Sequence, residues 1–91
     1  METREMKLIN EVYAHNTRPK NMICCIEEMS ELTKVLTKEL RNDPKFTTEK
    51  LAEELAHVLL MCNVIAYDYG IEPDIIYWNQ QDAVRRMKEE K

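Results

Sequence analysis

The chain has 91 residues, of which 44% are hydrophobic and 33% charged, and its formal net charge is −4. One glycine and three prolines are too few for a collagen-like, disordered or turn-rich all-β protein. Acidic and basic residues are mixed along the chain, so no strongly basic face is expected and unaided nucleic-acid binding is disfavoured. We therefore expect one domain over residues 1–91, of a size that often relies on oligomerisation or a metal.

The cellular setting is predicted from the N-terminus, the apolar runs and the cysteines. The first residues lack the apolar core of a signal peptide, and the longest apolar run, 58–62, is too short to cross a bilayer. Three cysteines without a CxxC pair are typical of buried thiols in a reducing compartment. The expectation is a cytoplasmic protein without a membrane partner.

Amphipathic stretches between the backbone breakers predict four helices, near residues 3–15, 19–42, 48–69 and 73–89. Pro19 suits the first turn of the second helix, with Thr17 or Arg18 as its N-cap. Either Thr47 or Thr48 can cap the third helix.

The remaining breakers define the connections. Residues 42–44 (Asn-Asp-Pro) form a turn, Gly70 suits a left-handed residue just past a helix, and Pro73 suits the first turn of the last helix. The expected fold class is therefore all-α: four helices with a central antiparallel helical hairpin, assembling into a helical-bundle dimer or tetramer.

Apolar residues recur at spacings of 3 and 4 in both central helices, which predicts a helix–helix seam. In the second helix the predicted seam contains Met22, Cys25, Met29, Leu32 and Leu36. In the third helix it contains Leu51, Leu55, Val58, Cys62, Ile65 and Tyr69.

Two pairs of polar residues flank this seam, Glu28 with Glu31 and Glu54 with His57. Each pair is spaced i, i+3 and projects from one side of its helix, in the same rotational sense. The residues are also equidistant from the turn, so Glu28 should lie near His57 and Glu31 near Glu54. Clustered carboxylates suit Mg²⁺ or Mn²⁺, and the alternative is that these are solvated faces of ordinary helices. Apolar residues bracket the cluster: Cys24, Val35, Met61 and Val64.

These motifs resemble those of the MazG-like all-α nucleoside triphosphate pyrophosphohydrolases, which carry EExxEL followed by EELxDVL. The matching segments are Glu27-Glu28-Met29-Ser30-Glu31-Leu32 and Glu53-Glu54-Leu55-Ala56-His57-Val58-Leu59, and the resemblance covers about residues 20 to 72. It implies an α-helical homodimer or homotetramer that binds a nucleoside triphosphate with Mg²⁺ or Mn²⁺. The reaction implied is hydrolysis between the α and β phosphates, giving a monophosphate and pyrophosphate.

By position, the resemblance makes Glu28, Glu31 and Glu54 metal ligands and puts His57 in the place of the fourth acid. It makes Glu27 a candidate catalytic residue that activates water.

Lys34, Lys38 and Lys50 lie on the same helices and are candidates for binding phosphate oxygens, with simple solvent exposure as the alternative.

His57 departs from the family pattern, because it replaces an anionic oxygen donor with a neutral nitrogen. Mg²⁺ accepts that poorly, whereas Mn²⁺, Fe²⁺, Co²⁺ or Zn²⁺ accept it. The last helix also has Asn79, Gln80 and Gln81 where the family often has a basic residue.

Two alternatives follow. The chain is either an impaired enzyme or a catalytically inactive relative that binds nucleotides or other proteins. A less favoured reading is a di-metal carboxylate bundle, because Glu54-x-x-His57 matches the motif of such bundles.

Overall fold

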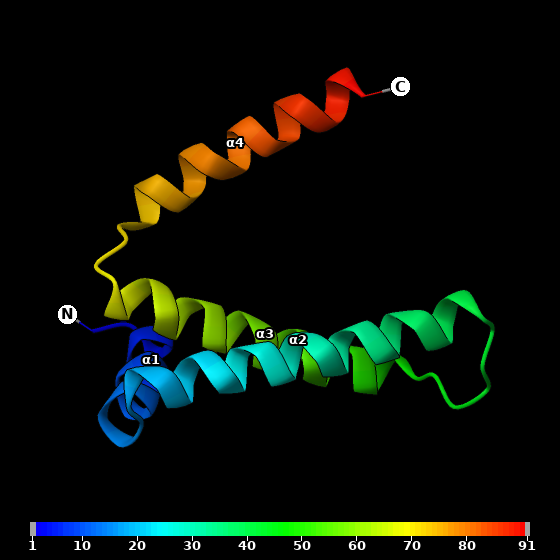
Figure 1. The fold of residues 1–91 in the computed structure, drawn as a ribbon, viewed down its shortest axis with the longest axis horizontal. Coiled ribbons are helices and arrows are strands. Elements are labelled where there is room, and N and C mark those ends of the chain that lie inside the picture. Colours follow the sequence, from blue (N-terminus) through cyan, green and yellow to red (C-terminus); the bar gives the residue numbers. More distant parts are fainter. Residues whose placement is uncertain (1, 91) are drawn as a thin grey trace.

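A computed structural model describes residues 2–90 of the chain, and these form four α-helices and no strand. The helices are α1 (Arg4–His15), α2 (Arg18–Leu40), α3 (Thr48–Asp68) and α4 (Pro73–Glu89), shown in Figure 1. The all-α class predicted from the sequence is confirmed, and the helix bounds agree with prediction to within two residues. No helix within residues 2–90 combines the length and apolar character needed to span a membrane.

Local capping explains where the central helices begin and end. The side-chain oxygens of Thr17 and Thr47 accept hydrogen bonds from the backbone N–H groups of Lys20 and Lys50, at 3.3 and 3.1 Å. Gly70 follows α3 with a φ of 65°, a left-handed conformation that favours glycine. These ends are therefore set by short-range interactions that the sequence already specifies.

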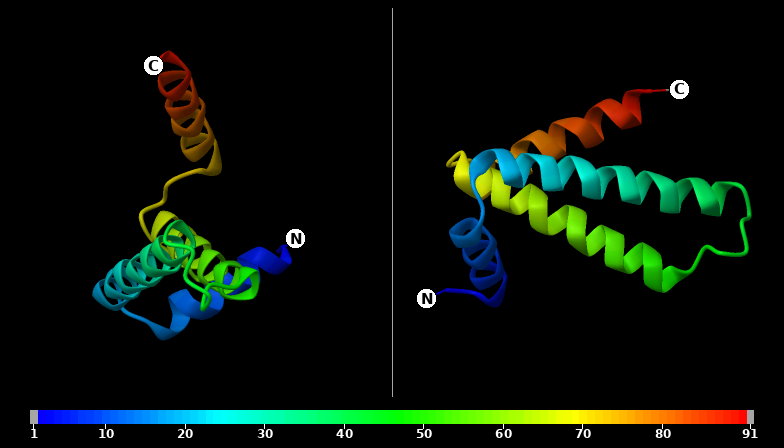
Figure 2. Two further views of the ribbon diagram at one scale, coloured as in Figure 1. Left: turned by 90° about the vertical axis from the view of Figure 1, so that its right-hand side faces the viewer. Right: turned by 60° about the horizontal axis from the view of Figure 1, so that its bottom comes forward.

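The helices α2 and α3 lie side by side and run in opposite directions, and α1 packs against the C-terminal part of α3 (Figures 1 and 2). The edge-on contact between the rings of Tyr13 and Tyr67, with centroids 5.2 Å apart, joins α1 to α3. The guanidinium of Arg18 binds both carboxylate oxygens of Asp68, at 2.7 and 3.3 Å, and lies 4.4 Å from the centre of the Tyr69 ring. These contacts hold the start of α2 to the end of α3. The hydrogen bond from Arg18 to Asp68 also raises the pKa of Arg18.

The face that α2 and α3 present to each other differs from the predicted seam. Buried side chains on the two helices include Cys25, Val35, Met61, Val64 and the carboxylate of Glu54. Five residues predicted to lie in the seam are instead exposed: Met29, Leu36, Leu55, Cys62 and Tyr69. The apolar surface of each helix is wider than one seam, and the helices are rotated so that part of it faces away from the partner helix.

This rotation gives the α2–α3 pair two different sides. Residues two apart on a helix point about 160° away from each other, so Ile26 and Leu59 face away from Glu28 and His57 respectively. We call the side that bears Glu27, Glu28, Glu31, Glu53 and His57 the acidic side. The opposite one, the apolar side, bears exposed Ile23, Ile26, Met29, Leu36, Leu55 and Leu59.

The last helix, α4, extends away from the other three (Figures 1 and 2) and packs extensively against none of them. It contains no buried residue, and Trp78 is 58% exposed. Ion pairs of Asp82 with Arg85 and Arg86 support the helix from within. The Cα radius of gyration is accordingly 15.6 Å, against about 12 Å for a compact domain of this length.

Candidate metal centre

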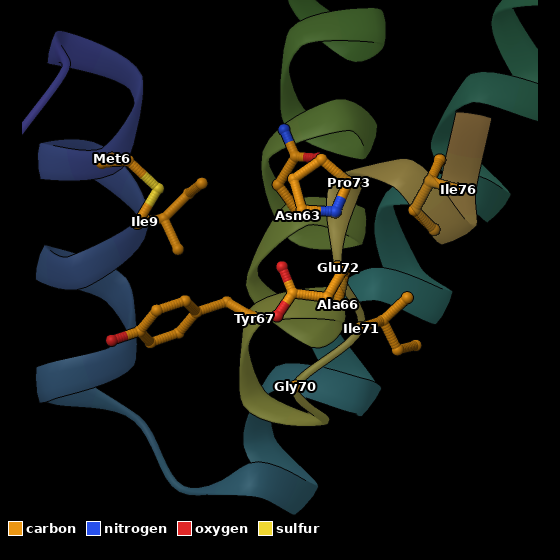
Figure 3. Close-up of a pocket in the computed structure, with 10 residues that line it drawn as sticks. All are labelled: Met6, Ile9, Asn63, Ala66, Tyr67, Gly70, Ile71, Glu72, Pro73 and Ile76. Atoms are coloured by element: carbon orange, nitrogen blue, oxygen red, sulfur yellow. The ribbon is translucent and has the colours of Figure 1, made fainter.

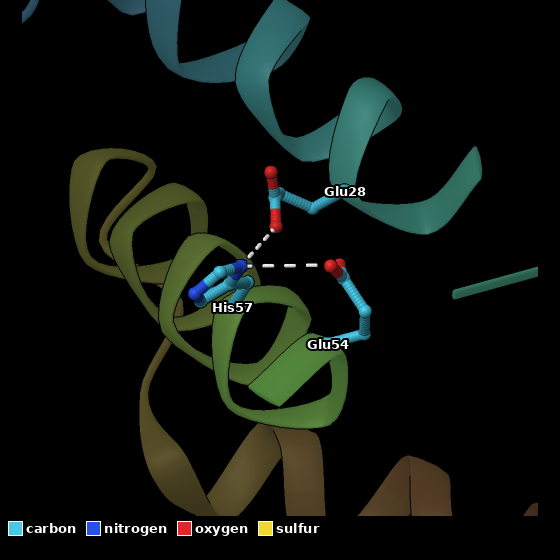
Figure 4. A group of neighbouring side chains, drawn as sticks. All are labelled: Glu28, Glu54 and His57. Atoms are coloured by element: carbon cyan, nitrogen blue, oxygen red, sulfur yellow. Dashed lines mark ion pairs between the residues drawn. The ribbon is translucent and has the colours of Figure 1, made fainter. Parts of the chain in front are cut away.

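Three side chains that could bind a metal ion come together where α2 and α3 pack: Glu28, Glu54 and His57 (Figure 4). The Nδ1 atom of His57 lies 2.6 Å from Oε2 of Glu28 and 3.8 Å from Oε2 of Glu54. One ligand atom from each residue lies within 4.8 Å of the other two. The predicted proximity of Glu28 and His57 is thus confirmed by the register of the two helices.

Each of the two carboxylates places one buried oxygen, Oε2, toward His57. The Glu54 side chain is only 5% exposed, and that of Glu28 is 27% exposed. Neither Oε2 atom accepts a hydrogen bond of good geometry, although Oε2 of Glu28 lies at ion-pair distance, 2.6 Å, from Nδ1 of His57. Buried acceptors without a donor destabilise a fold by about 1–3 kcal/mol each. A cation among these atoms would relieve that cost, so the donor set fits a divalent metal ion.

Lys50 partly balances the charge of this cluster from one turn earlier on α3. Its Nζ lies 3.4 Å from Oε1 of Glu54 and 3.8 Å from Oε2 of Glu53. Glu54 is the leading cause of a raised pKa for Lys50, so the lysine is positively charged at neutral pH. The contact engages the outer oxygen of Glu54 and leaves Oε2 facing His57. Opposite charges four residues apart on one helix are the sequence signal for this pairing.

The other predicted site residues lie outside the three-residue cluster. Glu31 pairs with Lys34 at 3.2 Å, and both side chains are substantially exposed. Glu27 is exposed and Lys38 is half-buried, both on α2. The structure therefore brings Glu28 to His57 but does not bring Glu31 into the cluster, and the roles predicted for these four residues stay predictions.

A pocket of about 490 Å³ lies apart from the cluster, between α1, the end of α3 and the start of α4 (Figure 3). Its lining is mainly apolar and includes Met6 and Ile9 of α1, Tyr67 of α3 and Ile76 of α4. Glu72 is its one ionisable carboxylate. This pocket lacks the cationic groups that a triphosphate requires, so it is not a candidate for the phosphate site.

Comparison with protein-family models, with curated proteins and with solved structures finds no match to this chain. The candidate site is therefore defined by its own geometry.

Proposed function

We propose that the chain is a metal-dependent nucleotide pyrophosphohydrolase, which hydrolyses the α–β phosphate bond of a nucleoside or deoxynucleoside triphosphate. The observation that carries the proposal is the convergence of Glu28, Glu54 and His57, with two buried carboxylate oxygens that accept no hydrogen bond. The resemblance of the two motifs to MazG-like enzymes supplies the reaction. The products are a nucleoside monophosphate and pyrophosphate, with one water molecule consumed.

Glu28, Glu54 and His57 would hold the divalent ion, with Mg²⁺ or Mn²⁺ as the ions that the resemblance implies. Such an ion neutralises phosphate charge and lowers the pKa of the attacking water. Exposed Glu27, one residue before Glu28, is available to take a proton from that water. Lys34, Lys38 and Lys50 provide positive charge on the flanks of the acidic side, where phosphate oxygens would lie.

The proposal includes a homodimer or homotetramer in which two copies bury their apolar sides, with the α2–α3 pair as the central hairpin. The chain has a mass of 10.9 kDa and exposes 7529 Å². A compact monomer of that mass exposes about 5,600 Å². The excess of roughly 1,900 Å² is more than twice the about 800 Å² that one partner contributes to a standard interface. A second copy of this chain accounts for that excess.

The decisive experiment is a screen for pyrophosphate release from common ribo- and deoxyribonucleoside triphosphates, with Mg²⁺ and with Mn²⁺. We expect release from at least one substrate, and loss of that release in Glu54→Gln. Glu49→Gln is the matched control, because it removes an exposed carboxylate from the first turn of the same helix. Release unaffected by Glu54→Gln would contradict the site. Folded protein that is inactive on every substrate with both ions would contradict the enzyme.

The inactive alternative makes a different prediction in the same samples. A non-catalytic relative binds a nucleotide and gives heat in calorimetry, but it forms no product. The observation that favours it is His57 itself, because an imidazole at the centre of the cluster replaces the anionic carboxylate of the family motif. If His57→Asp gains hydrolysis where the natural chain has none, the scaffold is competent and His57 is the cause.

A further inference from the structure

We propose that the cluster of Glu28, Glu54 and His57 selects a nitrogen-accepting transition-metal ion, of the Zn²⁺ and Co²⁺ class, over Mg²⁺. This inference deepens the proposed function, on whose site it rests, because it names the class of cation for that site. It concerns binding alone and does not require that the protein hydrolyse anything.

The first argument is the chemistry of the donor atoms. The atoms that converge are two carboxylate oxygens and one imidazole nitrogen, Nδ1 of His57. Figure 4 shows this nitrogen facing both carboxylates, while the other ring nitrogen points away from them. Mg²⁺ prefers a near-octahedral shell of oxygen atoms, whereas imidazole suits Zn²⁺ and related ions. A site centred on a ring nitrogen therefore discriminates against Mg²⁺.

The second argument is the number of ligands that the protein can supply. Lys50 engages Oε1 of Glu54 at 3.4 Å, which leaves that carboxylate a single inward-facing oxygen. Oε2 of Glu54 belongs to a side chain that is 95% buried, faces His57 and has no hydrogen-bonding partner. Three protein ligands with room for water or substrate is the arrangement typical of catalytic zinc sites, and it is too few for Ca²⁺.

The third argument is the spacing and charge of the cluster. Metal–ligand bonds of about 2.0–2.2 Å in tetrahedral geometry place ligand atoms about 3.4 Å apart. The two separations from Nδ1 of His57, 2.6 and 3.8 Å, bracket that value. The side chains of His57 and Glu28 are 46% and 27% exposed and are free to adjust, whereas Glu54 is fixed by burial. The two carboxylates carry a charge of −2, which Lys50 offsets only in part, so the cluster also attracts a divalent ion electrostatically.

The experiment is calorimetric titration of chelator-treated full-length protein with Zn²⁺, Co²⁺, Mn²⁺ and Mg²⁺ as chloride salts, with no nucleotide present. We expect Zn²⁺ and Co²⁺ to bind at least about 100-fold more tightly than Mg²⁺, and Co²⁺ to give visible absorption bands of low coordination number. His57→Gln and His57→Asp both replace nitrogen by oxygen. His57→Gln should weaken Co²⁺ binding at least about tenfold, since even residues that only support ligands are worth that much, and His57→Asp should reduce the preference for Co²⁺ over Mg²⁺.

Two controls separate this site from other metal-binding groups. Glu49→Gln should bind Co²⁺ as the natural protein does, because the exposed carboxylate lies outside the cluster. Cys62→Ser removes an exposed thiol, which is a competing ligand for Zn²⁺ and Co²⁺. This variant should also bind Co²⁺ as the natural protein does, because Cys62 lies outside the cluster. Equal affinity for Mg²⁺ and Co²⁺, or Co²⁺ binding that is unchanged in His57→Gln, would overturn the inference.

The failures of the two proposals are distinguishable. Preferential Co²⁺ binding that depends on His57, without hydrolysis of any triphosphate under any ion, would leave the inference standing and remove the enzyme. Hydrolysis with Mg²⁺, accompanied by no preference for Co²⁺ over Mg²⁺, would support the enzyme and overturn the inference on metal selectivity.

Discussion

The two sides of the α2–α3 pair are built from the same two helices but have opposite character. On the acidic side, Glu28 and His57 approach each other closely although neither buried carboxylate oxygen in the cluster has a hydrogen-bonding partner. On the apolar side, Ile26 and Leu59 are each 62% exposed to water. Each side is unfavourable for an isolated chain, the first through charge that is only partly compensated and the second through apolar exposure. Both would be relieved by binding, the acidic side by a cation and the apolar side by a second copy.

The largest expected effect comes from placing charge on the apolar side. The double variant Ile26→Asp with Leu59→Asp should convert the proposed dimer or tetramer into a monomer near 10.9 kDa, measured by light scattering after size-exclusion chromatography. Burying unpaired carboxylates in an apolar interface costs on the order of several kcal/mol each. Ala56→Asp is the control, since it adds the same charge to an exposed position of α3. An unchanged mass in the double variant would show that this side is not the interface.

The next effect tests whether the acidic side reduces the stability of the metal-free protein. Glu54→Gln should raise the free energy of unfolding in chelator by about 1 kcal/mol, because the buried carboxylate oxygen without a partner becomes a neutral amide. Urea unfolding monitored by circular dichroism measures the change. Glu53→Gln is the matched control, because Glu53 also pairs with Lys50 but is 53% exposed, and it should leave stability nearly unchanged. Destabilisation by Glu54→Gln would mean that the carboxylate supports the fold.

A smaller effect concerns α4, which we expect to be covered as well in the proposed dimer or tetramer. The roughly 1,900 Å² excess is larger than one standard interface contribution, so the apolar side alone need not account for it. Trp78, the one tryptophan of the chain, is 58% exposed and reports on α4. Its fluorescence should be blue-shifted in the natural assembly relative to the Ile26→Asp, Leu59→Asp monomer. Identical emission maxima would place α4 outside the interface.

The ends of the helices and the pairing of residues along the α2–α3 pair are features that the sequence specifies. Helix ends were predictable because they depend on local chemistry, as Thr17, Thr47 and Gly70 illustrate. The proximity of Glu28 and His57 was predictable as well, because in an antiparallel helix pair with a short connection the position of the turn determines which residues lie opposite each other. Both kinds of prediction need only helix geometry and the position of one turn.

The rotation of each helix about its axis was not predictable in the same way. Apolar residues cover more than one face of α2 and α3, and periodicity cannot say which part meets the neighbouring helix and which meets another molecule. Leu55 was therefore assigned to the seam but lies on the apolar side. Glu31 was expected beside Glu54. It is not part of the three-residue cluster and pairs with Lys34 one turn away, but it lies near enough to Lys50 to help raise the pKa of that lysine.

The smallest expected effect concerns Cys25, which is buried where α2 and α3 pack together. It tests whether water reaches the interior of the α2–α3 pair. Burial, together with the neighbouring Cys62 thiol, raises the pKa of Cys25 above its ordinary value of 9.0. Its contribution to stability is therefore complete below pH 9, where folded and unfolded chains both hold the proton. Above pH 9 the unfolded chain loses the proton first, so the contribution declines as pH rises through the folded-state pKa. In urea unfolding under reducing conditions, the natural protein should exceed Cys25→Ala in stability by a margin that is constant near pH 7 and narrows above pH 9. A margin that stays constant up to pH 10 would mean that water reaches this thiol, and that the seam beneath the acidic side is open.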